Sequence, residues 1–372
     1  MYNYNIKKKP AVGVITRVKT VKKLLKQKPL PGLLSLEAAN KSVGLTLYYF
    51  SINDIDLGKR IINGVYLNQE RGIWEKKVFQ YPDFIYKKTA GSRKYKNLMY
   101  NFERQLTELN IPILNYKKGF NKWEVYQHLA KDKNILPHLP LTVIYNEPAD
   151  LRNMLKSEEK VYLKGLTGGR GRKIVCISKL PEGGYEYKFF TDKLYIFKAK
   201  NFNRLIRGVL AFYGGHKFLI QKAIDLIQAG GGLVDMRAEV QRGKNGELAV
   251  AAIPVRVGKA NTPITTHAGA YTFEYFFKNF MDYPEVEIQV LKERITRFLK
   301  SVYRCLENAY GTSVEIGIDF GLDKKGRLWF IECNARSMKV SLYKAYGEQT
   351  IRDSFSNILE YAGFRYKNPS FS

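Results

Sequence analysis

The stretch WFIECNARS, residues 329 to 337, ends an apolar run with a glutamate and an asparagine two positions apart. Side chains alternate between the two faces of a β-strand. Glu332 and Asn334 should therefore share one face, while Trp329 and Ile331 should point to the other. A carboxylate and an amide at the end of a core strand indicate a polar site rather than more core.

A second apolar run, VEIGIDFGL, lies just upstream, and the Lys-Lys-Gly between the two runs predicts an antiparallel hairpin. With a two-residue turn at 325–326, Asp319 lies opposite Glu332 and Gly317 lies opposite Asn334. A four-residue loop would make the same pairs diagonal. Either register places two carboxylates and an amide oxygen on one face.

Two facing carboxylates repel each other, so a cation must lie between them or one of them must hold a proton. Oxygen ligands alone favour a hard cation such as Mg²⁺ or Mn²⁺. The alternative is a solvated face of an edge hairpin, in which water separates Asp319 from Glu332. This segment alone does not distinguish the two.

A glycine-rich loop forms the second chemical feature. VYLKGLTGGRGRKIVCIS, residues 161–178, reads as strand, loop and strand. Its glycines let backbone N–H groups turn toward an anion, and its basic residues supply positive charge. The segment lacks GxxxxGK[ST], and no helix follows, which excludes a P-loop. Taken alone, the loop is better explained as a basic hairpin tip.

Two arginines follow in strand-like segments. Asp235, Arg237 and Glu239 share a face of the strand that ends HKFLIQKAIDLIQAGGGLVDMRAEVQR, and Arg256 ends the next strand, AVAAIPVRVG. The planar guanidinium matches two oxygens of a phosphate or carboxylate. Taken singly, each of these arginines is better explained as a surface charge.

The elements around these residues predict an α/β chain in two parts. Residues 11–18 read as a buried strand, 30–44 as a helix that ends at a glycine, and 45–51 as the next strand. A helix is expected over 93–109 and another over 121–132, with a domain boundary near 114–120. No GxGxxG follows the first strand, so a dinucleotide site is not supported.

Composition bounds the class of protein. The chain has 372 residues, of which 45% are hydrophobic, so it can bury more than one core. It has no run of 18 apolar residues and no secretory start, which predicts a cytoplasmic protein without a transmembrane segment. Cys176, Cys305 and Cys333 are too far apart to indicate a disulfide framework or a zinc site.

The net charge of +28 predicts attraction to a polyanion, such as an acidic polypeptide, nucleic acid or an anionic surface. Zinc-finger spacing and the RNP pattern are both missing, and the basic residues are spread along the chain. A specific nucleic-acid partner is therefore not expected.

The order of these motifs resembles one known arrangement. A lysine opens a helix, another precedes the glycine loop, a strand ends in Gln-Lys-Ala-Ile, D-x-R follows, and a D…E-x-N hairpin closes the series. This order is similar to the ATP-grasp superfamily. The wording FNKWEVYQHL, LIQKAIDL and IECNARS resembles the YheC/YheD family of endospore coat-associated ATP-grasp proteins, and PDFIYKK and AVGVIT resemble that family's N-terminal region.

The resemblance implies an ATP-grasp fold with an N-terminal α/β pre-ATP-grasp domain over 1–113. The ATP-grasp domain would span 114–372, with a lid subdomain at about 138–222. Lys122 and Lys164 would hold the α- and β-phosphates of ATP. The loop would cover the triphosphate, and the cofactor-binding set would include Gly168, Gly169, Arg170 and Gly171.

Further roles are implied in the same way. Gln221 and the backbone at Ala223 would meet the adenine edge, with Asp225 or Gln228 near the ribose. Arg237 and Arg256 would be catalytic and steady the transferred phosphoryl group. Asp319, Glu332 and Asn334 would bind Mg²⁺ or Mn²⁺. Ser337 stands where many relatives have a proline, which should loosen the exit of the strand.

The implied activity is a carboxylate–amine ligase that uses ATP and Mg²⁺ and forms a C–N bond through an acyl-phosphate. The stretch from Arg256 to Gly269 also resembles the ribosomal-protein glutamate ligases, which favours adding an amino acid to a peptide or spore coat protein. The family implies a role in sporulation, in the mother-cell cytoplasm or the spore coat. A kinase acting on a hydroxyl and a non-catalytic, nucleotide-binding coat assembly protein are the alternatives.

Overall fold

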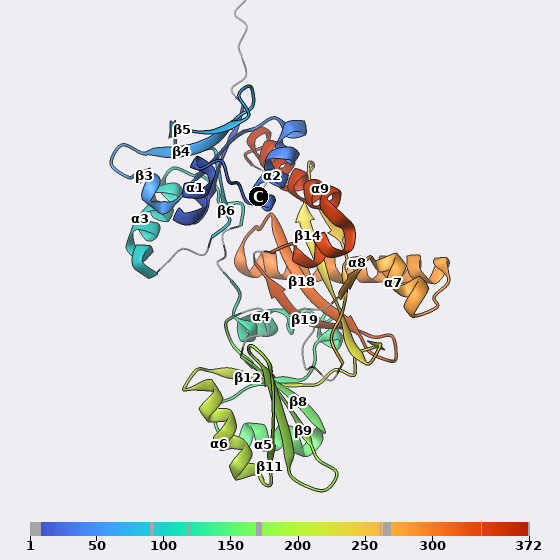
Figure 1. The fold of residues 1–372 in the computed structure, drawn as a ribbon. Helices are drawn as coiled ribbons and strands as arrows, with labels where there is room; N and C mark the ends of the chain where they lie inside the picture. The colour runs from blue at the N-terminus through green and yellow to red at the C-terminus, as the bar shows by residue number, and fades with distance from the viewer. Residues whose placement is uncertain are drawn as a thin grey trace, which may run out of the picture.

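The computed structural model describes residues 9–89, 93–115, 117, 119–168, 173–260, 262, 269–335 and 337–370. Three β-sheets follow one another down the long axis of the molecule (Figure 1). The N-terminal sheet, formed within residues 11–87, lies at one end, and the central sheet, formed within residues 228–334, lies in the middle. The sheet formed within residues 142–222 lies at the other end and is called the lid sheet, after the predicted lid subdomain. Helices and strands are mixed along the chain, in agreement with the predicted α/β class.

The N-terminal sheet has a parallel centre, in which β1 lies between β2 and β6, and an antiparallel extension. The predicted helix over 30–44 and strand over 45–51 are present as α2 and β2. α2 has Pro31 in its first turn and ends at Gly44, whose φ of 75° favours glycine. The elements are β1 (Ala11–Ile15), α1 (Val18–Leu25), α2 (Pro31–Val43), β2 (Thr46–Phe50), β3 (Ile55–Asp56), β4 (Ile61–Asn68), β5 (Ile73–Gln80), β6 (Phe84–Lys87) and α3 (Lys96–Glu108), with 3₁₀ turns at Ile52–Asp54 and Arg93–Tyr95.

The first predicted strand, 11–18, is shorter than expected. β1 ends at Ile15, and α1 begins at Val18. Val21 and Leu24 are buried three residues apart on α1, a helical spacing that the alternating Val and Ile before it obscured.

The lid sheet runs in the order β11-β10-β9-β8-β12-β7, and α5 and α6 pack on one of its faces. The predicted strands on either side of the glycine loop are β8 and β9. α4 precedes the lid and confirms the helix expected from residue 121. The elements are α4 (Lys122–Leu129), a 3₁₀ turn at Leu136–His138, β7 (Thr142–Ile144), α5 (Pro148–Ser157), β8 (Lys160–Gly165), β9 (Ile174–Lys179), β10 (Tyr185–Phe190), β11 (Leu194–Ala199), α6 (Phe202–Tyr213) and β12 (Phe218–Lys222).

The central sheet is antiparallel and has two unlike faces. One face packs against α4, α7 and α8 in a large hydrophobic core. The other face carries Asp235, Arg237 and Glu239 of β14 and Asp319 of β18. The elements are β13 (Gln228–Ala229), β14 (Gly232–Arg242), β15 (Leu248–Ala252), β16 (Val255–Val257), β17 (Gly269–Tyr271), α7 (Phe273–Phe280), α8 (Glu285–Tyr310), β18 (Glu315–Leu322), β19 (Leu328–Asn334) and α9 (Val340–Lys367).

The C-terminal helix α9 joins the central and N-terminal sheets. It bends at Gly347, and its buried residues Phe355 and Ile358 belong to the same hydrophobic core as Val12 and Val14 of β1. The core beneath the N-terminal sheet therefore includes the end of the chain as well as its beginning. The domain limits expected at 113/114 and 138–222 remain predictions.

A buried charged cluster reinforces this junction. Lys339 Nζ donates to Glu315 Oε2 at 2.7 Å and to Ser354 Oγ at 2.8 Å, and Tyr86 Oη of β6 donates to Glu315 Oε1 at 2.8 Å. The lysine's charge and the hydroxyl groups compensate the buried carboxylate. A search of the described helices finds none with the length and apolar character needed to cross a membrane.

Candidate active site

The hairpin of β18 and β19 has the predicted pairs but a different turn. Asp319 pairs with Glu332 and Gly317 with Asn334. The loop between the strands spans residues 323–327 instead of a two-residue turn. The register shifts by one position between Asp319 and Phe320, and this irregularity restores the pairs that a tight turn would have given.

The register shift also changes which side chains face the core. Leu328 and Phe330 lie in the large core, whereas Ile331 is the unpaired extra residue between Phe330 and Glu332 and lies against Gly321, on the face that carries Asp319. The expectation that Ile331 points away from Glu332 is therefore wrong. Strict alternation breaks at the irregularity, so residues on its two sides cannot be assigned to faces by counting twos.

The acid and the arginine on the polar face of the central sheet are paired. Arg237 Nε and Nη2 donate to the two carboxylate oxygens of Asp319, each at 2.5 Å. Arg256 makes the same fork with Asp235, at 2.6 and 2.7 Å. Arg256 Nη2 also lies 3.4 Å from Asp319 Oδ2. Two hydrogen bonds fix the orientation of each planar guanidinium group, and both groups lie beside the carboxylate of Asp319.

Burial would by itself raise the pKa of Asp319, but the charges of Arg237 and Arg256 outweigh it and hold that pKa below its usual value. The pairing in turn raises the pKa of both arginines, although burial opposes it. Asp319 is therefore an anion and the arginines are cations at any ordinary pH.

Glu332 faces two cations across the gap between elements. Its Oε2 lies 3.4 Å from Lys122 Nζ of α4, and its Oε1 lies 4.0 Å from Arg237 Nη2. Asn334 Nδ2 approaches Glu332 Oε1 at 3.5 Å. The arrangement brings all three predicted oxygen ligands to one end of the polar face.

The two predicted phosphate-binding lysines approach the site from different elements. Lys122 opens α4, where Asn121 caps the helix by accepting from Trp123 N. Its Nζ donates to Gly168 O at 3.2 Å, and its backbone N–H donates to Leu166 O at 2.9 Å. α4 is thereby tied to the start of the glycine loop.

Lys164 is the residue before the last of β8 and pairs with Leu219 of β12. Its Nζ donates to Gln221 Oε1 at 2.6 Å, and Gln221 Nε2 donates to Thr142 Oγ1 at 2.9 Å. Burial lowers the pKa of Lys164 to about 8, despite the nearby charge of Glu332. Among the described residues, Gln221 is the one hydrogen-bond acceptor of this ammonium, and an anion beside it would stabilise its charged form.

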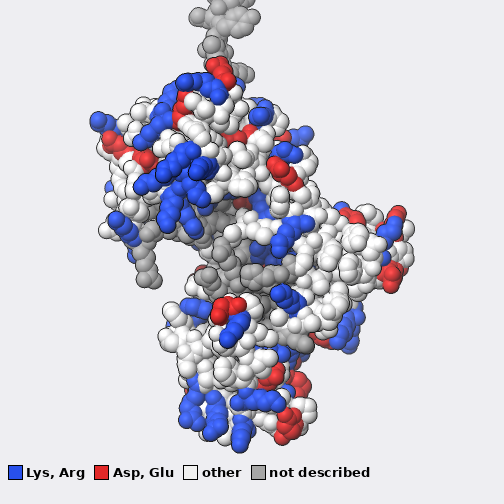
Figure 2. Space-filling view, in the orientation of Figure 1, with Lys and Arg blue, Asp and Glu red and all other residues white. Residues whose placement is uncertain are grey.

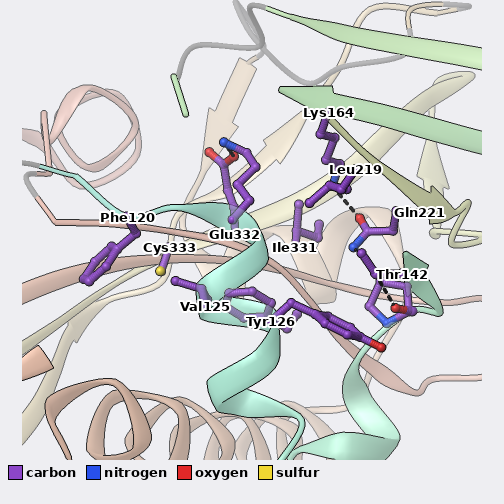
Figure 3. Close-up of a pocket in the computed structure, with 13 residues that line it drawn as sticks. Phe120, Val125, Tyr126, Thr142, Lys164, Leu219, Gln221, Ile331, Glu332 and Cys333 are labelled. Atoms are coloured by element: carbon purple, nitrogen blue, oxygen red, sulfur yellow. Dashed lines mark hydrogen bonds and ion pairs between the residues drawn. The ribbon is translucent and has the colours of Figure 1, made fainter. Parts of the chain in front are cut away.

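A pocket lies between α4, the lid sheet and β19 (Figure 3). Lys164, Gln221 and Thr142 lie on one side of it, and Glu332 lies on the other. Apolar side chains form the walls between these polar ends. The lining residues are Phe120, Lys122, Val125, Tyr126, Pro140, Thr142, Lys164, Leu219, Gln221, Phe330, Ile331, Glu332 and Cys333.

The apolar walls were missed by the sequence analysis. Leu219 lies two residues before Gln221 on β12, so strand alternation could have placed it on the same face. Phe120 and Tyr126 gave no such signal, because only the docking of α4 onto β19 brings them to the pocket. An apolar slot with polar ends suits a flat, partly polar ligand.

Only some of the predicted site residues that the structure describes line this pocket. Lys122, Lys164, Gln221 and Glu332 do, whereas Gly168, Ala223, Asp225, Arg237, Arg256, Asp319 and Asn334 do not. Asp225 is exposed and forms an ion pair with Lys324 at 3.0 Å. Ala223 is half-buried, and its N–H donates to Lys160 O at 3.1 Å, so that donor is already used. Gly169, Arg170 and Gly171 lie outside the described residues, as does most of the stretch between Arg256 and Gly269.

Ser337 behaves differently from the expectation of a looser strand exit. Its hydroxyl donates to Glu239 Oε1 on β14, and Lys339 Nζ lies 3.4 Å from Glu239 Oε2. The segment after Asn334 is thereby attached to the central sheet. Where a proline would stiffen the backbone, this chain uses a side-chain hydrogen bond.

The donor set fits a hard divalent cation. Asp319 and Glu332 are adjacent across the hairpin, Asn334 follows on the same face, and all three offer oxygen. Among the described residues, no three His, Cys, Asp or Glu side chains gather tightly enough to form a metal cluster by themselves. Two carboxylates and one amide would leave further positions for the oxygens of a phosphate ligand.

Comparisons with known proteins point to one family. A family model described as YheC/D like ATP-grasp matches residues 110–364. The endospore coat-associated protein YheD of Bacillus subtilis is 28% identical over 88% of this chain and 72% of its own length. The endospore coat-associated protein YheC of the same organism is 23% identical over 85% and 87%.

Solved structures confirm the predicted fold. The D-alanine–D-alanine ligase of Bacillus anthracis aligns over 97% of this chain and 99% of its own, with a TM-score of 0.52 and 13% identity. The D-alanyl-alanine synthetase A of Vibrio cholerae aligns over 95% and 99%, with a TM-score of 0.50 and 11% identity. These likenesses establish the ATP-grasp fold.

Proposed function

Because the chain belongs to the YheC/D-like ATP-grasp family, we propose that it is an ATP- and Mg²⁺-dependent ligase that joins a carboxylate to an amine. One observation carries the proposal. Lys122 of α4 and Lys164 of the lid sheet line one pocket together with Glu332, and Glu332 connects this pocket to Arg237 and Asp319 of the central sheet.

Different parts of the pocket would bind different parts of ATP. The adenine would lie between the apolar walls, with Gln221 at its edge. The faces of the ring would pack against apolar side chains, and a few polar groups would contact its edge. Lys164 and Lys122 would bind the α- and β-phosphates. Gly168 O, which Lys122 now contacts, would give way to the phosphate.

Asp319, Glu332 and Asn334 would hold Mg²⁺ or Mn²⁺, which when bound neutralises phosphate charge. Arg237 and Arg256 lie beside this end and would contact the transferred phosphoryl group. Their pairing with Asp319 and Asp235 fixes both forks before substrate arrives, so little reorganisation is needed during the reaction.

The proposed reaction has two displacements. A substrate carboxylate oxygen attacks the γ-phosphorus of ATP, the bond to the β-phosphate oxygen breaks, and ADP leaves. An amine then attacks the carbonyl of the acyl-phosphate, and phosphate leaves as the nitrogen loses a proton. Positioning and charge stabilisation can supply most of the acceleration, so no protein nucleophile is required.

The relatives are named as endospore coat-associated proteins. We therefore propose that this chain acts during sporulation, in the mother-cell cytoplasm or at the coat. An amino acid added to a peptide or coat protein would fit the proposed chemistry.

A hydroxylamine trap tests the first displacement before the amine is known. The protein is incubated with Mg-ATP, a panel of peptides with free carboxylates, and hydroxylamine, which converts an acyl-phosphate to a hydroxamate detectable by mass. ADP and hydroxamate should form together, and Arg256→Met should abolish both. Arg304→Met is the matched control, because Arg304 is exposed on α8.

Two other outcomes would replace the proposal. A phosphorylated product without hydroxamate would identify a kinase that acts on a hydroxyl. Binding of Mg-ATP without ADP formation, over the whole panel, would support a nucleotide-binding assembly protein that does not catalyse.

A further inference from the structure

A row of lysines occupies the solvent face of α1. Lys19, Lys22, Lys23 and Lys26 follow the spacing i, i+3, i+4, i+7, which places them on one side of a helix. All four are exposed, whereas Thr20, Val21 and Leu24 are buried on the opposite side. This set of four is called the lysine row below.

No ion pair among the described residues neutralises the lysine row. α1 has no acidic residue in its first turn, where the helix dipole favours negative charge. Like charges three and four residues apart also destabilise a helix. Lys22 and Lys23 lie in the last turn, where the helix dipole favours positive charge, so the unfavourable effect is the mutual repulsion of the four lysines, which an anion lying along the row would relieve.

The surroundings extend the positive charge. Arg17 and Lys28 flank the helix, and both are exposed. Gln27 links the end of α1 to β5 through two hydrogen bonds with the backbone of Trp74, at 3.0 and 2.8 Å. β5 then adds the exposed Lys76 and Lys77. Figure 2 shows Lys and Arg gathered on the N-terminal domain where Figure 1 draws α1.

Aliphatic side chains lie among these cations. Leu25, Leu30 and Leu34 are 40%, 38% and 45% exposed, and Val78 of β5 is 55% exposed. The stretch from Arg17 to Leu34 contains no aromatic residue on which a base could stack. Cations mixed with aliphatic groups suit an acidic polypeptide that carries apolar side chains better than they suit a nucleic acid.

The lysine row also begins close to the junction with the central sheet. α1 follows β1, and the last residue of β1, Ile15, accepts from Lys88 N at the end of β6 at 3.0 Å. Tyr86 of β6 in turn contacts Glu315, which lies on the same strand as Asp319. A chain bound along α1 would thus start at the carboxyl end of β1, next to the end of β6, the strand that contacts the central sheet through Tyr86.

We propose that the lysine row is the docking surface for an acidic polypeptide segment of the substrate that supplies the carboxylate. The part of this proposal that makes the segment the source of the carboxylate rests on the proposed ligase function. As a binding surface, it can be tested without turnover.

The test compares two variants of the full chain that lose the same charge. One carries Lys→Gln at positions 19, 22, 23 and 26. The control carries Lys→Gln at positions 133, 156, 200 and 244, which are exposed lysines of other elements. The probes are a labelled peptide of alternating Glu and Leu, the same peptide with Gln for Glu, a short DNA duplex, and vesicles with anionic lipid. Fluorescence anisotropy or co-sedimentation is measured at low and moderate salt.

The row variant should bind the Glu–Leu peptide about tenfold more weakly than the native chain, and the control should change less than about twofold. Salt should weaken this binding in the native chain, because exposed charges are screened over about 10 Å at 0.1 M. The Gln peptide should not bind, and Mg-ATP affinity should be equal in all three proteins.

Equal losses in the row and control variants would overturn the proposal, since the attraction would then be general. DNA or vesicles that bind as tightly as the peptide, and lose as much in the row variant, would also overturn a polypeptide-specific surface. Failure of the hydroxylamine trap with intact peptide binding would refute the ligase and leave the docking surface standing.

Discussion

Arg237 and Asp319 face each other across β14 and β18 and share two hydrogen bonds of 2.5 Å. Arg256 approaches the same carboxylate from β16. The acid expected to bind metal is therefore balanced by the arginines expected to contact phosphate. Since a carboxylate oxygen has more than one lone pair, Asp319 can keep these partners and still offer a ligand position.

Replacing Asp319 should cost stability as well as function. Asp319→Ala leaves Arg237 and Arg256 partly buried without their shared carboxylate, and the free energy of unfolding should fall by about 3 kcal/mol. Urea denaturation measures the loss. Glu293→Ala is the control, because its ion pair with Arg297 is exposed. A loss below about 1 kcal/mol for Asp319→Ala would show that Arg237 and Arg256 do not need the charge of Asp319 for stability.

Glu332→Gln should preserve the fold and weaken metal-dependent nucleotide binding. The amide keeps the size of the side chain but not the negative charge that a divalent cation requires. Isothermal calorimetry should find ATP affinity that rises with Mg²⁺ in the native chain and responds little in the variant. Glu287→Gln, at an exposed position of α8, should behave as the native chain. Identical metal dependence in all three proteins would exclude Glu332 as a ligand.

Lys164 should take up a proton when ATP binds. Its pKa is lowered to about 8 by burial, so it is partly neutral at pH 8, and a phosphate beside it would raise that pKa again. Calorimetry in buffers of different ionisation enthalpy should detect uptake near pH 8 and much less at pH 6.5. Lys164→Met should remove the uptake. An uptake that persists in this variant would assign the proton to another group.

Much of the site was predictable because it depends on local order along strands. Asp319, Glu332 and Asn334 were placed on one face by a hairpin argument, and the structure pairs them as expected. The predicted two-residue turn was wrong, however. The loop is longer, and the register shift near Ile331 brings the same residues opposite each other. The sequence of β19 alone does not indicate an extra residue, because the register shift depends on how β18 and β19 pair.

Contacts between distant segments were out of reach. The fork between Arg256 and Asp235 requires knowing that β16 lies beside β14 in a particular register. The junction of Tyr86, Glu315 and Lys339 joins three segments that lie more than 20 residues apart. Charge alone gives no partner when 62 basic and 34 acidic residues compete. Only the fold selects which of them meet.

Glu37 should make the stability of the protein fall as pH rises from about 4.5 to about 7. It is 4% exposed on α2, and its Oε1 has no hydrogen-bond partner among the described residues. Burial raises its pKa to about 7, although Tyr49 and Lys41 partly oppose the shift. A carboxyl with a raised folded-state pKa contributes stability that is complete below about pH 4.5 and is lost as pH rises through about 7.

Glu37→Gln removes this dependence because the amide stays neutral. At pH 8 the variant should unfold with a free energy higher than that of the native chain by on the order of 2 kcal/mol. At pH 5 the two should be nearly equal, since the native carboxyl is then protonated. Urea unfolding at several pH values, with the exposed Glu70→Gln as control, measures the difference. A difference that stays constant from pH 5 to pH 8 would mean that Glu37 keeps its charge in the folded protein and is solvated or paired there.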